Sequence, residues 1–180
     1  PRLMACSYTG DALAQASFGY ELLIARGQIE PGSPAADQFI ADSLKDVVMH
    51  EIGHALGLRH NFRGSTGISR AQLRDPAFTT QRGLSNSIMD YNALNLPLDG
   101  EPASTVQMGT LGTYDYWAIE YGYKPFPADQ EAQALAELAG RSARDANLAY
   151  ATDEDADTTD PTVNRFDLGD DPLAYYRKRL

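Results

Sequence analysis

Apolar residues recur at helical spacing in two long stretches of the first third of the chain. The first stretch, residues 11–26, has apolar residues three to four positions apart and is followed by a glycine: Leu13, Ala16, Tyr20, Leu23 and Gly27. After turn residues at 30–34, the second stretch, residues 37–56, returns to this spacing: Phe39, Ile40, Leu44, Val47 and Val48. A repeat of this kind is typical of one face of an α-helix, so the pattern predicts two helices here.

The rest of the chain alternates long loops with shorter helical segments. Residues 59–109 are rich in Gly, Asn, Ser and Pro, with one short helix indicated by a capping box that begins at Ser69. Helices are predicted at 113–120, before Gly122, at the alanine-rich stretch 129–150, and after Asp171-Pro172. No internal repeat and no strong β-alternation is present, so the pattern predicts a mostly helical chain with long loops and little sheet.

Composition limits the possible classes of protein. A chain of 180 residues with 43% hydrophobic residues is the size of one globular domain, here residues 1–180. Twenty-five acidic against 15 basic residues give a net charge of −10, which argues against a nucleic-acid partner. No apolar run reaches the length of a membrane span. The single cysteine, Cys6, excludes an internal disulfide framework and a cysteine-based structural zinc site.

One segment, HEIGHALGLRH at residues 50–60, has the residue types and spacing of a catalytic zinc site. His50 and His54 are four positions apart on the helix predicted at about 37–57, so both imidazoles can face one metal ion. Gly57 can adopt the left-handed conformation that ends a helix and lets His60 return as a third ligand. Three protein ligands leave a fourth position open for water, as in catalytic zinc sites.

Glu51 follows the first ligand and is the predicted general base. Bound Zn²⁺ lowers the pKa of a water ligand toward about 7 and polarises a carbonyl, and a neighbouring carboxylate can take the proton of that water. Ordinary helix and loop histidines are the alternative interpretation. It is disfavoured because all three histidines of the chain fall on the ligand positions of this motif.

The full motif resembles the metzincin metalloproteases, and this resemblance implies a methionine-containing turn below the zinc. The segment SIMDY, residues 87–91, fits such a Met-turn. In this interpretation Met89 packs beneath the three imidazoles as an apolar side chain, and the alternative is an ordinary core methionine. Tyr91 matches a tyrosine that binds zinc or donates to the oxyanion in some metzincins. A tyrosine packed nearby with no direct role is the other interpretation.

Three longer strings, HEIGHALGLRHNFRGS, SIMDYNALNLPLDG and LGTYDYWAIEYGYKP, look like those of large bacterial zinc-dependent metalloproteases with a matrixin-like catalytic region. The resemblance covers most of the chain from about Ala41. It implies an α+β metzincin-like catalytic domain, C-terminal helices after 113 that support the site, and endopeptidase activity on a protein or peptide substrate. By the same analogy the protein is expected to be secreted, periplasmic or attached to a bacterial cell envelope.

One departure from the family pattern concerns the residues before the motif. Metzincins usually place a twisted sheet before the zinc helix, whereas the 49 residues before His50 are predicted to be helical. The chain also starts with proline rather than methionine, so we expect a piece of a longer polypeptide whose remainder completes the substrate cleft. Substrate binding by strand addition is not supported by this sequence.

Two lesser features and two alternative functions complete the sequence-based interpretation. The acidic residues 153–157 do not form an EF-hand; calcium binding there is possible but unsupported, and a solvated loop is favoured. Cys6 is interpreted as a buried or idle thiol, because its surroundings do not match the latency cysteine of matrixins.

The alternative functions are a catalytically idle zinc-binding fragment, with Cys6 or an acidic residue closing the site, and hydrolysis of some other amide.

Overall fold

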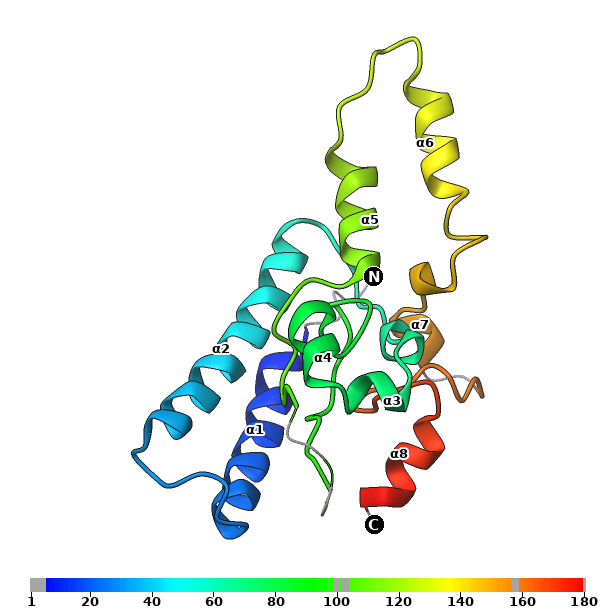
Figure 1. Cartoon of the computed structure of the whole chain (residues 1–180). Helices are drawn as coiled ribbons and strands as arrows, with labels where there is room; N and C mark the ends of the chain where they lie inside the picture. The colour runs from blue at the N-terminus through cyan, green and yellow to red at the C-terminus, as the bar shows by residue number, and fades with distance from the viewer. Residues whose placement is uncertain (1–5, 99–100, 102–103, 157–158, 180) are drawn as a thin grey trace.

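The computed structural model describes residues 6–98, 101, 104–156 and 159–179, and these fold into helices joined by long loops (Figure 1). No strand occurs in these ranges, so the α+β character implied by the resemblance is not seen in them. Bounds of the α-helices are α1 Tyr8–Ala25, α2 Pro34–Ala55, α3 Arg70–Leu73, α4 Pro76–Arg82, α5 Thr113–Tyr123, α6 Glu131–Ala139, α7 Asp153–Ala156 and α8 Pro172–Arg179. Two short 3₁₀ turns are η1 Gly64–Gly67 and η2 Ala146–Leu148.

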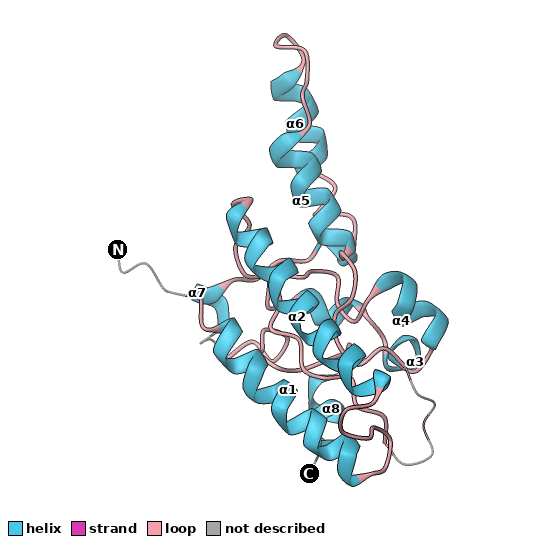
Figure 2. Cartoon of the chain, turned by 90° about the vertical axis from the view of Figure 1, so that its left-hand side faces the viewer, coloured by secondary structure: helices cyan, strands magenta, loops and turns pink. Residues whose placement is uncertain are grey.

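Helices α1 and α2 lie side by side and antiparallel along one side of the molecule (Figures 1 and 2). Their contact is apolar where Leu23 of α1 and Phe39 of α2 meet Leu94 from the central loops. Both helices lie within three residues of the bounds predicted from the apolar spacing. Among the helices described, none is both long and apolar enough to cross a membrane.

Helix α2 buries polar residues together with apolar ones, and it also exposes a row of large apolar side chains. Its buried residues include two polar ones, Asp46 and His50, whereas large apolar side chains four positions apart are exposed: Ile40, Leu44, Val48, Ile52 and Leu56. The spacing correctly predicted the helix, but most of the residues that carried it are not core residues here. The buried face of α2 instead carries the polar groups of the histidine motif, which pack against the central loops.

The loops between α2 and α5 contain much of the core. Buried side chains of one cluster come from this region and from the segment before α8: Ile68, Leu73, Leu84, Ile88, Met89, Ala93, Met108 and Leu168. The capping box predicted at Ser69 is present at the start of α3. Helix α4 was not predicted, although Asp75 caps it and Pro76 occupies its first position.

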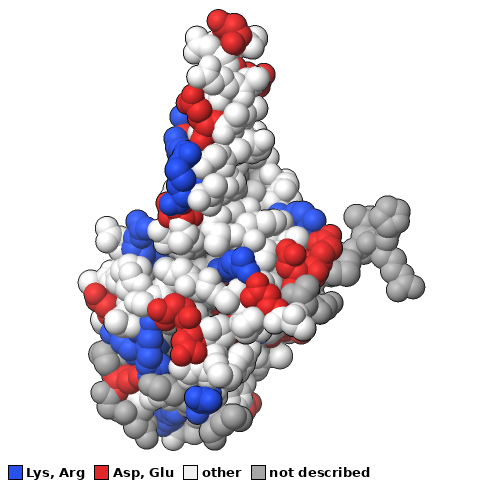
Figure 3. All heavy atoms as spheres, turned by 90° about the vertical axis from the view of Figure 1, so that its right-hand side faces the viewer, with Lys and Arg blue, Asp and Glu red and all other residues white. Residues whose placement is uncertain are grey.

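Helices α5 and α6 project together away from the rest of the molecule (Figures 1 and 2). Trp117 of α5 donates its indole N–H to the Leu138 carbonyl of α6 at 2.8 Å. The prediction of one helix over 129–150 was wrong in extent, because α6 ends before Gly140 and turns follow it. Basic and acidic side chains lie next to one another along the projecting part of the molecule (Figure 3). Lys124 and Arg141 both form ion pairs with Glu120 there.

Candidate metal centre

Four side chains that can bind a metal meet where α2 ends against the central loops. They are Cys6, His50, His54 and His60, and their ligand atoms all lie within 4.8 Å of one another. The two Nε2 atoms of His54 and His60 are 3.1 Å apart. The Sγ atom of Cys6 lies 3.5 Å from Nε2 of His50 and 3.4 Å from Nε2 of His60.

The end of α2 explains how the three histidines converge. His50 and His54 share one face of the helix, and Gly57 then takes a φ of +85°. The amide of Gly57 donates to the His54 carbonyl at 2.9 Å, and the amide of Leu58 donates to the Gly53 carbonyl at 3.0 Å. This pair of bonds is a Schellman motif, and it reverses the chain so that His60 faces the helix it has just left.

Each imidazole is oriented by an oxygen atom that accepts a hydrogen bond from its Nδ1 atom. The acceptors are the Ile88 carbonyl for His50 at 2.7 Å, the Leu58 carbonyl for His54 at 3.0 Å, and the Asp153 carboxylate for His60 at 2.8 Å. A carbonyl or carboxylate oxygen only accepts, so the three Nδ1 atoms carry the protons and the Nε2 lone pairs face the cluster. Orientation through the second ring nitrogen is characteristic of histidines that bind metals.

Asp153 is a site residue that sequence reasoning missed, because it lies 93 residues from His60. The acidic stretch 153–157 was noted only as a loop or a possible calcium site. In the structure Asp153 bonds to His60 and Glu154 bonds to Arg59, whereas residue 157 of that stretch lies outside the described residues. Backbone bonding of Phe62 to Ala151 at 2.8 Å brings Asp153 to this position.

Met89 is fully buried and packs against α2 at Gly53, one position before His54 in the sequence. A Cβ atom added to Gly53 would overlap the Met89 sulfur, so the thioether occupies the space that any larger residue at position 53 would need. Glycine is unfavourable within a helix by about 1 kcal/mol relative to alanine, and this close contact explains its presence. The Asn61 amide donates to the Met89 carbonyl at 2.9 Å, which joins the segment after His60 to the turn.

The buried carboxylate of Asp115 holds the turn at 87–89 from below. It accepts hydrogen bonds from the Ser87 hydroxyl at 2.8 Å, the Ile88 amide at 2.9 Å and the Gly112 amide at 2.7 Å. Burial raises the pKa of Asp115, while these three hydrogen bonds act in the opposite direction. Helix α5 therefore supports the turn through its first residues, at the place where the family resemblance expected support.

Glu51 and Tyr91 both lie close to the Cys6 sulfur. Glu51 is exposed, and its Oε1 atom is 4.0 Å from Cys6 Sγ; the Tyr91 hydroxyl is 3.4 Å from the same atom. The Tyr91 ring is buried and packs edge-on against His60, with 4.9 Å between ring centroids. Burial raises the pKa of Tyr91 to about 12.

The donor set fits a zinc ion. Burial lowers the pKa of His50 to about 3 and also lowers that of His60, although Asp153 opposes the second shift, so both rings are in the neutral form that binds metals. Facing lone pairs on His54 and His60 repel one another unless a cation lies between them. Tetrahedral zinc requires nitrogen–nitrogen separations of about 3.3 Å and nitrogen–sulfur separations of about 3.6 Å, close to the 3.1, 3.4 and 3.5 Å found.

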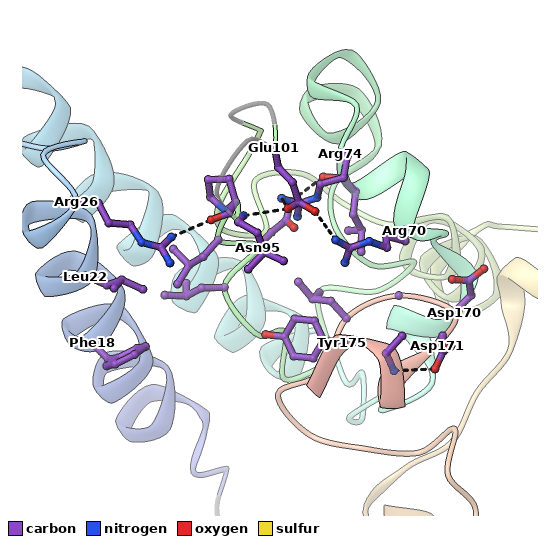
Figure 4. Close-up of a pocket in the computed structure, with 18 residues that line it drawn as sticks. Phe18, Leu22, Arg26, Arg70, Arg74, Asn95, Glu101, Asp170, Asp171 and Tyr175 are labelled. Carbon is purple, nitrogen blue, oxygen red and sulfur yellow. Dashed lines mark hydrogen bonds and ion pairs between the residues drawn. The ribbon is translucent and has the colours of Figure 1, made fainter. Parts of the chain in front are cut away.

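A cavity of about 320 Å³ lies apart from the histidines, between α1, α3, α8, the segment 94–98 and Glu101 (Figure 4). Its apolar walls include Phe18, Leu22 and Tyr175, and on one side Glu101 pairs with Arg70 and Arg74. None of its lining residues belongs to the metal cluster, so we do not place the chemistry there.

Comparison with known proteins agrees with the geometry of the histidine cluster. The model of a family described as Met-zincin matches residues 32–180, which include all three histidines, Glu51 and the turn at Met89. No curated protein and no solved structure matches the chain. Membership implies the metzincin superfamily of zinc metalloproteases and therefore a zinc ion at this cluster. The chain belongs to the Met-zincin family.

Proposed function

We propose that this chain carries the catalytic centre of a zinc-dependent endopeptidase, with His50, His54 and His60 as the metal ligands. The observation that carries the proposal is the convergence of three Nε2 lone pairs, each oriented by its own acceptor, beside an exposed glutamate. When bound, zinc would make a water ligand acidic and polarise the scissile carbonyl.

Glu51 is the proposed general base. The Cys6 sulfur marks the fourth position around the histidines, and in this respect it stands in for the oxygen of the attacking water. The Glu51 carboxylate lies 4.0 Å from that sulfur without reaching the histidine nitrogens as a ligand. It can take a proton from a water held there and deliver it to the leaving amine.

Tyr91 is the proposed donor to the oxygen that becomes negatively charged during attack. Its hydroxyl lies 3.4 Å from the same sulfur, on the side of His60. A phenol O–H aimed at a developing oxyanion stabilises it more than the neutral carbonyl, and such donors are worth about 3 kcal/mol in other enzymes. The proximity supports this role over that of a merely packed tyrosine.

The substrate class, a protein or peptide, rests on the family alone. The large apolar residues exposed on α2 are consistent with a cleft completed by the rest of the parent polypeptide, as the resemblance implied. Export to the periplasm, cell envelope or medium is proposed on the same analogy.

Replacing Glu51 with glutamine tests the proposal. Glu51→Gln removes the base but none of the histidines, so the variant should keep bound zinc while its peptide hydrolysis falls by about 10²–10⁴-fold. Glu131→Gln, the same change at an exposed position of α6, is the control and should match the wild type in both measurements. Hydrolysis by Glu51→Gln at the wild-type rate would remove the general-base assignment.

A second candidate function has one observation in its favour. Cys6 lies where a fourth ligand would close the coordination sphere, as expected of a catalytically idle zinc-binding domain. This alternative predicts stoichiometric zinc and no peptide hydrolysis, even after Cys6 is replaced.

A further inference from the structure

The cavity between α1, α3 and α8 has no part in the proposed function, because none of its lining residues belongs to the metal centre. Its volume is about 320 Å³ (Figure 4). Pockets that bind small molecules have volumes of about 300–1,000 Å³, so this cavity is at the lower end of that range. It is large enough for one small ligand.

Apolar side chains from separate parts of the chain form much of the cavity wall. Leu94 and Leu168 are buried, Leu22 of α1 and Tyr175 of α8 are half-buried, and Phe18 of α1 is 55% exposed. A ligand in the cavity would cover apolar surface that is now in contact with water. Because removal of such surface from water is favourable, this wall favours a ligand with an apolar body.

Positive charge is concentrated on one side of the cavity. Arg26, Arg70 and Arg74 lie along the upper side of Figure 4, with the carboxylate of Glu101 among them. Arg70 and Arg74 both pair with Glu101, whereas Arg26 donates to the uncharged carbonyl of Pro97 at 2.9 Å. Three guanidinium groups against one carboxylate give this arginine side of the cavity a net charge of +2.

Arg74 is the arginine whose interactions are least complete. Its side chain is 16% exposed, and its buried Nε atom has no hydrogen-bond partner in the part of the chain that the structure describes. Burial lowers the pKa of Arg74 and the neighbouring charge of Arg70 adds to this shift, while Glu101 opposes it. A second anionic group beside Glu101 would offset both the loss of hydration and the repulsion between the two guanidinium groups.

The two other carboxylates of the cavity lie at the start of α8, to the right in Figure 4. Asp171 caps this helix, because its Oδ1 atom accepts a hydrogen bond from the Ala174 amide at 2.9 Å. The positive end of the helix dipole therefore offsets part of its charge. Asp170 is exposed, so water and salt screen its charge. An anionic head group is consequently favoured at the arginine side and not beside α8.

We propose that this cavity binds one small amphipathic anion, a carboxylate with a single apolar chain. The planar head group is held by Arg70 and Arg74, since a guanidinium fork matches the two oxygens of a carboxylate. The apolar chain packs against Phe18, Leu22 and Tyr175. The bound ligand thus joins α1, α3 and α8, and this site is independent of the zinc and of the proposed peptidase activity.

Binding of octanoate, measured by isothermal titration calorimetry on the whole chain, tests the ligand class. We expect saturable binding of one octanoate per chain. The uncharged analogue 1-octanol has the same apolar chain and should bind at least about tenfold more weakly, because it cannot form the charged hydrogen bonds. Absence of saturable octanoate binding would overturn the site. Equal affinities for octanoate and 1-octanol would overturn the role of the arginines.

Substitutions in the wall test where the ligand lies. Arg70→Gln and Arg74→Gln should each weaken octanoate binding at least about tenfold, and Arg70, whose side chain is 40% exposed, is the safer change for the fold. Arg82→Gln is the matched control, because exposed Arg82 lies outside the cavity and contacts Thr113. Phe18→Ala should weaken octanoate and 1-octanol alike.

Three results of this series would overturn the proposed placement. Unchanged octanoate affinity in both Arg70→Gln and Arg74→Gln would remove the head-group site. An equal loss in Arg82→Gln would show attraction to positive charge in general and not binding in this cavity. Full affinity of Phe18→Ala for both ligands would remove the apolar chain from the wall of α1.

Discussion

Removal of the Asp153 carboxylate should weaken zinc binding although Asp153 is not itself a ligand. Its oxygens lie 2.8 and 3.0 Å from Nδ1 of His60, a buried ring whose orientation depends on that hydrogen bond. In Asp153→Ala the ring can rotate or change tautomer, which turns the lone pair of Nε2 away from the metal.

The size of the effect follows from the strength of such contacts. Loss of a hydrogen-bonding partner behind a metal ligand costs about 10–100-fold in affinity, or about 1.4–2.7 kcal/mol. For Asp153→Asn the loss of zinc affinity should be at or below the lower end of this range, because the amide oxygen still accepts a hydrogen bond from Nδ1 but carries no charge. The two variants therefore predict a graded series and not a single loss.

Competition with a chromophoric zinc chelator at neutral pH measures the affinity. The matched control is Glu154→Gln, the next residue of α7, whose carboxylate bonds to Arg59 at the surface. This ion pair is exposed and Glu154 bonds to none of the histidines, so the zinc affinity of Glu154→Gln should stay within about fivefold of the wild type. Unchanged affinity in Asp153→Ala, with the fold intact by circular dichroism, would refute the positioning role.

Two further predictions concern stability in the absence of metal. Gly53→Ala forces a Cβ atom into the Met89 sulfur and should lower the free energy of unfolding by about 1–2 kcal/mol in urea titration. In the control Gly122→Ala the new Cβ atom meets no atom within 4 Å, so this variant should be neutral or stabilising. Equal effects of the two variants would contradict the packing argument. Burial raises the pKa of Asp46 to about 7, so the folded state favours the neutral carboxyl, and stability present below about pH 4 is lost as pH rises toward 7. Asp46→Asn should thus gain up to about 4 kcal/mol over the wild type at pH 8 and nothing at pH 3, and a pH-independent difference would contradict the assigned pKa.

The helices and the motif were predictable because their signals are local. Apolar spacing located α1 and α2, and the left-handed glycine that ends α2 followed from the position of Gly57. Helix α4 had a readable start at Asp75-Pro76, but it is only seven residues long and lies in a stretch dominated by loop residues. The alanine-rich segment after 129 was overextended because helix propensity alone did not locate the end at Gly140.

Much of what completes the site could not be predicted, because it depends on contacts between distant residues. Asp153 reaches His60 across 93 positions, and Cys6 reaches the same ring across 54. An acidic stretch and a single cysteine carry no spacing signal of their own, so composition favoured a solvated loop and an idle thiol. The exposed apolar face of α2 is a related case, since spacing shows that residues share a face but not what lies against that face.

The three acceptors behind the histidines also govern how fast a bound zinc ion can leave. They belong to Leu58 at the exit of α2, Ile88 in the turn below and Asp153 in α7, and these segments are joined through tertiary contacts. Brief opening of any one segment releases one ligand, so zinc exchange should follow the fastest of three local unfolding reactions and not global unfolding. The four-residue helix α7 is the smallest of the three supports, and metal loss is expected to begin there.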